Sequence, residues 1–167
     1  MGIYISQIKS KFHRMKRRIN LKQKHIVSFS GGKDSTTMLL KMIENNMQVD
    51  KIIFGDTGVE FQELYDYIEK IEKYINMKII RIKSQITWDD WFYKPFSRGK
   101  NKGKLHGFPF VLGNGCWAKR ELKIKPLNSI EKSSDIIYLG IAADEKHRLE
   151  RKQYKNNPNK YKFPLVS

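Results

Sequence analysis

The stretch Ser28-Phe29-Ser30-Gly31-Gly32-Lys33-Asp34-Ser35-Thr36 carries the strongest signal of the fold. It follows a short β-like run, residues 25–27, and opens an apolar, helix-like run that reaches residue 43. Two adjacent glycines allow a tight turn and a close approach of the backbone to a ligand. The N–H groups of the first helical turn then point at an anion, and the helix dipole reinforces them. The stretch therefore predicts a phosphate-binding loop between a strand and a helix.

The side chains of this loop also suit a phosphate. Ser30, Ser35 and Thr36 offer hydroxyl donors, and Lys33 offers a positive charge. The common P-loop has a glycine five residues before its Gly-Lys pair, where this chain has Val27. The sequence therefore predicts a phosphate loop of another kind, and the alternative is an ordinary Gly-Gly turn before a capped helix.

Length and composition set broad limits. With 167 residues the chain is expected to form one domain with a real core. It has no apolar stretch near the roughly 18 residues of a membrane span, and its basic N-terminus lacks the apolar region of a secretory signal. The single cysteine, Cys116, excludes an internal disulfide and a cysteine-cluster metal site made by this chain alone. We therefore expect a cytoplasmic protein without a membrane partner.

The net charge of +16 is large. It is typical of a surface that binds nucleic acid, and it also suits a polyphosphate substrate. A lysine-rich composition of the source is a third explanation. Nucleic acid thus remains a candidate partner.

Residues 1–24 predict a basic amphipathic helix. Apolar residues recur there at three- and four-residue spacing: Ile5, Ile8, Phe12, Met15 and Ile19. Such a helix either packs its apolar stripe on the domain or acts as an arm that binds nucleic acid or a membrane surface.

The rest of the chain, residues 25–167, alternates between strand and helix patterns. Strands are predicted at 25–30, 49–54, 77–82 and 135–141, and helices at 35–46 and 60–75. This alternation predicts an α/β fold, a Rossmann-like parallel sheet with helices on both faces. Ligands of such sheets bind at the carboxyl ends of the strands, so the glycine loop and the Gly55–Gly58 turn are expected to share one site.

Residues 94–116 are rich in glycine and in basic side chains. They predict a mobile basic loop, which serves either as a lid over phosphates or as a solvated linker. The aromatic residues just before it, residues 88–96, either stack on bases or belong to the core.

Four segments resemble motifs of a known family. Residues 30–35, Ser-Gly-Gly-Lys-Asp-Ser, resemble the signature of the PP-loop ATP pyrophosphatases and their sulfonucleotide-reductase relatives. Asp56-Thr57-Gly58, Leu122-Lys123 with Pro126, and Gly140-Ile141 with a following acidic pair resemble motifs of the phosphoadenosine phosphosulfate (PAPS) reductase family. The resemblance implies an adenine nucleotide α-hydrolase-like variant of the Rossmann fold.

The resemblance also implies a set of site residues. The nucleotide-binding residues would be Ser28, Ser30, Gly31, Gly32, Lys33, Asp34, Ser35, Thr36, Asp56, Thr57, Gly58, Gly140 and Ile141. Lys33 and Asp34 would be the catalytic pair, and Lys123, Arg148 and Arg151 would contact phosphate or sulfate. No metal ligand is assigned with certainty. Asp56 either accepts ribose hydroxyls, holds a magnesium-bound water, or only complements a helix dipole.

The sequence departs from the family at two places. Ala142 stands where the sulfonucleotide reductases have an arginine, which removes a bidentate anion clamp. The resemblance ends near residue 165, without the C-terminal third that carries the nucleophilic cysteine of the reductases. We therefore expect either a truncated chain or a protein partner that supplies the thiol, and the sequence leaves open whether this chain alone is an enzyme.

The resemblance favours two chemistries. In one, PAPS is bound and a thiolate attacks its sulfonate, as in sulfonucleotide reduction or a related sulfur transfer. In the other, ATP with Mg²⁺ adenylates a nucleic-acid or small-molecule acceptor for thiolation. A non-catalytic module associated with nucleic acid is the third hypothesis.

Overall fold

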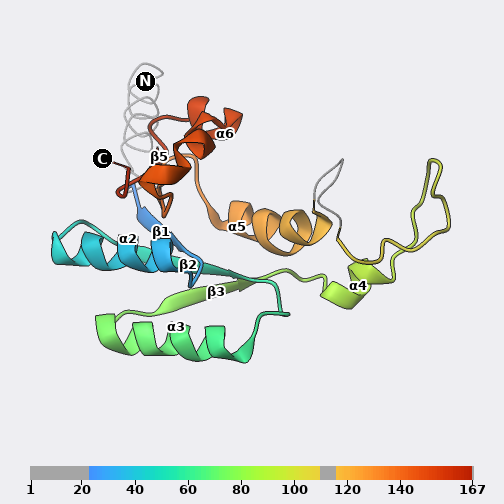
Figure 1. The fold of residues 1–167 in the computed structure, drawn as a ribbon, viewed down its shortest axis with the longest axis horizontal. Coiled ribbons are helices and arrows are strands. Elements are labelled where there is room, and N and C mark those ends of the chain that lie inside the picture. The colour runs from blue at the N-terminus through green and yellow to red at the C-terminus, as the bar shows by residue number, and fades with distance from the viewer. Residues whose placement is uncertain (1–22, 110–115, 167) are drawn as a thin grey trace, which may run out of the picture.

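The structure, a computed structural model, describes residues 23–109 and 116–166. Its centre is one sheet with the strand order β3-β2-β1-β4-β5 (Figure 1). The strands are β1 (His25–Phe29), β2 (Lys51–Asp56), β3 (Ile79–Lys83), β4 (Ile136–Leu139) and β5 (Tyr161–Lys162). Every neighbouring pair is parallel, which confirms the predicted α/β sheet. The first four strands lie where the sequence predicts them, whereas the two-residue β5 was not predicted.

Helices cover both faces of this sheet, as the sequence predicts. On one face lie α2 (Lys33–Glu44) and α3 (Gln62–Ile75), and on the other lies α5 (Lys125–Ile130), entered through a π-helical segment, η1 (Lys119–Ile124). The larger core lies under α2 and α3 and includes Met38, Leu39 and Ile68. The smaller core lies under α5, where Leu127 packs on Ile53.

The strand order explains this division of the helices. The chain steps from β1 to β2 to β3 in one direction, so right-handed crossovers place α2 and α3 on the same face. It then returns past β1 to β4, which places α5 on the opposite face. All five strands therefore end at one carboxyl edge, the edge from which β3 continues to α4 (Trp88–Phe92) (Figure 1).

Two segments need comment because the sequence analysis singled them out. Residues 94–106 form a hairpin, in which Pro95 and Leu105 make an antiparallel bridge. Residues 110–115 of the predicted loop lie outside the described residues, and the predicted mobility of the loop stays a prediction. Of the predicted N-terminal helix, only Gln23 and Lys24 are described, and they are not helical; the remainder lies outside the described residues.

The last described part of the chain runs from β4 to β5 through η2 (Ala143–Glu150) and α6 (Lys152–Lys155). Throughout the described ranges, every helix is too short or too polar to cross a membrane.

Candidate functional site at the carboxyl edge

The glycine loop joins β1 to α2 at the carboxyl edge. Gly31 has a φ of +75°, in the left-handed region that favours glycine, and a Cβ on it would lie 2.3 Å from Leu64 Cδ1. Gly140, just after β4, is equally constrained, because a Cβ there would lie 2.8 Å from the backbone N of Ser35. The end of β4 thus packs directly against the first turn of α2, so Gly140 and the loop belong to one compact arrangement.

The loop hydroxyls bond mainly to the loop itself. Ser30 Oγ and Ser35 Oγ lie 2.9 Å apart, and the hydroxyls of Ser35 and Thr36 each donate to the Gly32 carbonyl at 3.0 Å. Ser35 and Thr36 are buried. These hydroxyls therefore fix the shape of the loop, and their predicted role as donors to a phosphate stays a prediction.

Charge is exposed at the mouth of the loop. The Lys33 side chain is 89% exposed, and its Nζ lies 3.9 Å from Asp34 Oδ1. Both residues belong to the first turn of α2, whose N–H groups lack intrahelical acceptors. Lys33 is therefore in a position to meet an anion from solvent at a helix N-terminus.

Asp56, at the end of β2, is 2% exposed and held by three donors. Its Oδ1 accepts from the Gly58 N–H and the Tyr65 hydroxyl, both at 2.8 Å, and its Oδ2 lies 3.2 Å from Lys83 Nζ. Burial raises the pKa of the Asp56 carboxyl, but the bonds from Tyr65, Gly58 and Lys83 outweigh burial and hold that pKa below its usual range. Burial, together with the bond to Asp56, raises the pKa of Tyr65 to about 12. Asp56 is thus a fixed negative charge at the carboxyl edge.

A cleft of about 270 Å³ opens beside this carboxylate. Asp56, Thr57 and Gly58 line one side of it, and Lys83 and Trp88 are among the residues on the other. The Thr57 hydroxyl donates to Glu60 Oε1 at 2.9 Å, which closes the turn. The sequence analysis missed Lys83 and Tyr65. Lys83 directly follows the strand predicted at 77–82, at the same edge, a signal that could have identified it.

The other predicted residues lie at varying places around this edge. Ser28 lies inside β1, in register with Ile53 of β2, and Ile141 is buried just after Gly140. Lys123 lies over the end of β2, with its Nζ 5.9 Å from the Phe54 ring centroid. Arg148 of η2 pairs with Glu145, whereas Arg151 is exposed. Their predicted contacts with phosphate or sulfate stay predictions.

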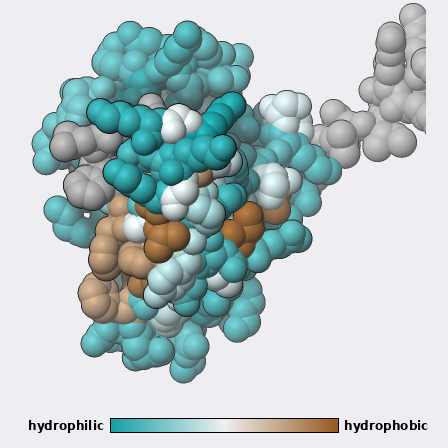
Figure 2. Space-filling model, turned by 90° about the vertical axis from the view of Figure 1, so that its right-hand side faces the viewer, coloured by the Kyte–Doolittle hydropathy of each residue, from teal (hydrophilic) through white to brown (hydrophobic). Residues whose placement is uncertain are grey.

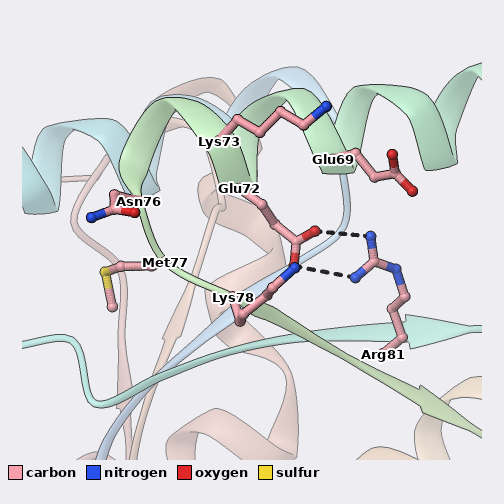
Figure 3. A pocket seen from close by; sticks show the side chains of 7 residues that line it. All are labelled: Glu69, Glu72, Lys73, Asn76, Met77, Lys78 and Arg81. Carbon is pink, nitrogen blue, oxygen red and sulfur yellow. Dashed lines mark hydrogen bonds and ion pairs between the residues drawn. The ribbon is translucent and has the colours of Figure 1, made fainter.

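A larger hollow, of about 510 Å³, lies at the opposite edge of the sheet (Figure 3). It is formed by the end of α3 and the start of β3, and the ion pair between Glu72 and Arg81 crosses it. None of its residues was predicted to bind a ligand. Over the ranges that the structure describes, no three His, Cys, Asp or Glu side chains gather closely enough to hold a metal ion.

The sheet, its two helical layers and the glycine loop at its carboxyl edge define a Rossmann-like α/β domain. Residues 24–164 match the phosphoadenosine phosphosulfate reductase domain, so the chain belongs to this family. The match covers both glycine turns and the segment after β4, which confirms the family predicted from those motifs.

Curated relatives are distant and longer. An uncharacterized protein of Methanocaldococcus jannaschii is 29% identical over 161 residues, which are 90% of this chain and 29% of the relative. An uncharacterized protein of Escherichia phage 186 is 30% identical over 97 residues, 58% of this chain and 26% of the relative. The adenosine 5'-phosphosulfate reductase of Bacillus mycoides is 25% identical over 125 residues, 74% of this chain and 49% of that enzyme. The chain thus spans less than half the length of the curated relatives it matches.

Proposed function

We propose that the chain is a sulfonucleotide-binding domain of sulfur metabolism, which holds an adenine nucleotide such as PAPS at the carboxyl edge. The observation that carries this proposal is the convergence of three turns there. The glycine loop and Gly140 pack together at the N-terminus of α2, where Gly140 fits only because it has no side chain, and the Asp56 turn ends the neighbouring strand β2 at the same edge. Membership of the reductase family and the similarity to adenosine 5'-phosphosulfate reductases support the same class of ligand.

The residues of the edge suit different parts of such a ligand. The N–H groups of the first turn of α2 and the exposed ammonium of Lys33 suit the phosphate or sulfate groups. The cleft beside Asp56 provides a buried, ionised acceptor, which suits the hydroxyl groups of a ribose. In this proposal the chain binds and orients the nucleotide, and a thiolate from a protein partner attacks the sulfonate sulfur. A sulfur–sulfur bond to the partner then forms as the bond from that sulfur to the phosphate oxygen breaks, and the nucleotide leaves with a free phosphate group.

ATP is the alternative nucleotide, and it would require Mg²⁺. Magnesium is usually bound by one or two carboxylates together with the substrate phosphates. The side chain of Asp34, 35% exposed in the first turn of α2, fits that role. Adenylation of an acceptor would then release pyrophosphate.

Calorimetric titration tests the proposal. Wild-type protein is titrated with PAPS, adenosine 5'-phosphosulfate and ATP–Mg²⁺, and the titrations are repeated with Lys33→Ala. Lys41→Ala is the matched control, because Lys41 is exposed on the same helix but near its other end. We expect a sulfonucleotide to bind more tightly than ATP, with a loss on the order of tenfold in Lys33→Ala only. A preference for ATP–Mg²⁺ would favour the adenylating chemistry instead, and binding of no nucleotide would refute the proposal.

A further inference from the structure

The hairpin of residues 94–106 projects from the end of the molecule beyond α4 (Figure 1). Its arms are joined by bonds from the Phe96 N–H to the Lys104 carbonyl and from the Gly103 N–H to the Phe96 carbonyl, both at 2.9 Å. Gly99 and Gly103 at the tip have φ values of +79° and +83°, which favour glycine. The hairpin is therefore a formed element and not simply a linker.

Aromatic packing anchors the base of the hairpin to the domain. The His106 ring stacks on Phe96 with centroids 4.0 Å apart, and Lys94 Nζ lies 4.3 Å from the ring centroid of Trp91, which is buried. The indole N–H of Trp117 donates to the Gly107 carbonyl at 3.1 Å. These contacts join the base of the hairpin to the aromatic cluster of α4.

The hairpin is more basic than the overall composition of the chain would predict. Overall the chain has 33 Lys and Arg and 17 Asp and Glu, yet no acidic residue occurs between Asp90 and Glu121. The hairpin carries five basic residues, all exposed: Lys94, Arg98, Lys100, Lys102 and Lys104. None of them takes part in an ion pair within the described part of the chain. A uniform lysine bias does not explain a stretch of 30 residues, 91–120, that has basic side chains and no carboxylate.

Two exposed aromatic rings flank the base of this basic surface. Tyr93 is 62% exposed and Phe108 is 71% exposed. Both meet Phe92 edge to face, with ring centroids 4.9 and 5.1 Å from that of Phe92, so both pack on the same side chain. Seen from this end, the front of the molecule is mainly hydrophilic, with scattered hydrophobic side chains between (Figure 2). Exposed rings beside a row of cations match a ligand that has both phosphates and flat apolar faces.

We propose that the hairpin, together with Tyr93 and Phe108, binds single-stranded nucleic acid. Cations along the hairpin neutralise the phosphodiester backbone, and the two rings stack on unpaired bases. A duplex would engage only the cations, because its bases are already stacked. An acidic polypeptide would likewise leave the rings unused.

The position of the hairpin adds to this inference. Trp88 and Asp89 of α4 line the cleft next to Asp56, and the hairpin begins two residues after α4 ends. A strand bound along the hairpin would therefore lie on the same side of the molecule as the carboxyl edge. Binding of nucleic acid goes beyond the proposed nucleotide binding and does not depend on it.

Fluorescence anisotropy with labelled oligothymidylate and oligouridylate tests the proposal across a series of salt concentrations. The triple variant Lys100→Ala, Lys102→Ala, Lys104→Ala is compared with a control triple, Lys41→Ala, Lys70→Ala, Lys73→Ala. The control removes the same charge from exposed lysines of α2 and α3. We expect the hairpin triple to lose at least tenfold in affinity and to flatten the slope of log K against log salt by about 2, since each phosphate contact on a single strand contributes about 0.7. The control triple should lose much less.

The rings are tested separately. In the double variant Tyr93→Ala, Phe108→Ala we expect a loss on the order of tenfold with an unchanged salt slope, because stacking releases no counterions. Tyr74→Ala is the control, since Tyr74 is 77% exposed on α3. Equal losses in the hairpin and control triples would overturn the proposal, as would equal affinity for a duplex or for polyglutamate. All variants are compared by thermal unfolding, and if the ring variant is destabilised the lysine triples decide.

Discussion

Two buried carboxylates at opposite edges of the sheet are built alike. Asp56 ends β2 at the carboxyl edge, and Glu72 lies near the end of α3 at the amino edge. Each accepts a backbone N–H, from Gly58 at 2.8 Å and from Ile79 at 2.7 Å. Each also pairs with a cation of β3, Lys83 for Asp56 and Arg81 for Glu72.

The cations make the difference between them. Arg81 binds Glu72 through two N–H groups, at 3.2 and 3.1 Å, and its side chain is 31% exposed. Lys83 offers a single ammonium, and its side chain is 63% exposed in a cleft. A two-pronged guanidinium fixes a carboxylate, whereas a solvated ammonium is readily redirected to another anion. The comparison indicates that Glu72 supports the fold and that Asp56 with Lys83 is available to a ligand.

The largest effect on stability is expected at Glu72. In Glu72→Ala the Ile79 N–H loses its acceptor and Arg81 loses its partner at the join of α3 and β3. We expect a loss of about 3 kcal/mol in the free energy of unfolding. Urea denaturation measures it, and nucleotide affinity, measured below the transition, should stay within a factor of two or so of the wild type. A large loss of affinity with intact stability would contradict the structural role.

For Asp56→Asn we expect the opposite: a smaller loss of stability and a large change in nucleotide affinity. Asparagine keeps an acceptor for Gly58 and Tyr65 but loses the charge that faces Lys83, so we expect a loss of about 1–2 kcal/mol of stability. The pKa of Asp56 is lowered on folding, so its ionised form stabilises the protein above a pH of about 4 and this contribution is lost as the pH falls through the folded pKa.

Denaturation curves at several pH values measure this. The variant should lose less stability than the wild type on acidification, and its affinity for a sulfonucleotide should change at least tenfold at neutral pH. Unchanged affinity would remove Asp56 from the candidate site.

The sequence alone predicted the position of Asp56, at the carboxyl edge, better than that of Glu72, at the amino edge. Asp56 follows an obvious buried strand, and the edge rule of parallel sheets then places it beside the glycine loop. Glu72 looks like an exposed residue of an amphipathic helix, because its burial depends on how β3 returns beneath α3. The hydrophobic pattern within the helix does not show where β3 will pack against it.

The errors in the predicted elements have the same origin. Phe61 lies within the helix predicted at 60–75, yet it is 84% exposed because it is the N-cap residue and the helix begins only at Gln62. The six-residue α5 was not predicted, since it is too short to show a helical period and begins with Lys125 and Pro126. Its place is fixed by the packing of Leu127 on the far face of the sheet.

Tyr65 tests the role of Asp56 at alkaline pH. Tyr65→Phe removes one of the donors to Asp56, and we expect a loss of about 1 kcal/mol at neutral pH. The pKa of Tyr65 is raised to about 12 in the folded protein. The neutral hydroxyl therefore contributes stability fully below pH 10, and this contribution is lost as the pH rises through about 12.

The absorbance of tyrosinate follows this titration directly. The wild type should show one tyrosine that ionises late, and this transition should be absent from Tyr65→Phe. The difference between the unfolding free energies of the two proteins should shrink above pH 10. Ionisation of Tyr65 at its ordinary pKa would mean that its bond to Asp56 is weak.

The smallest effect on stability is expected at Lys83. Comparing variants of Lys83 and Arg81 distinguishes the roles of Asp56 and Glu72 most directly. Arg81 and Lys83 lie two residues apart on β3 and so share one face of the sheet. Lys83→Met keeps the aliphatic stem and removes an exposed charge, which should cost about 0.5 kcal/mol, whereas Arg81→Met should cost several times more because it leaves Glu72 buried without its two donors. For a sulfonucleotide the order should reverse, with a loss of affinity only in Lys83→Met. Equal costs at the two positions, or a loss of affinity in Arg81→Met alone, would show that the geometry of the cation does not distinguish a ligand site from a structural ion pair in this sheet.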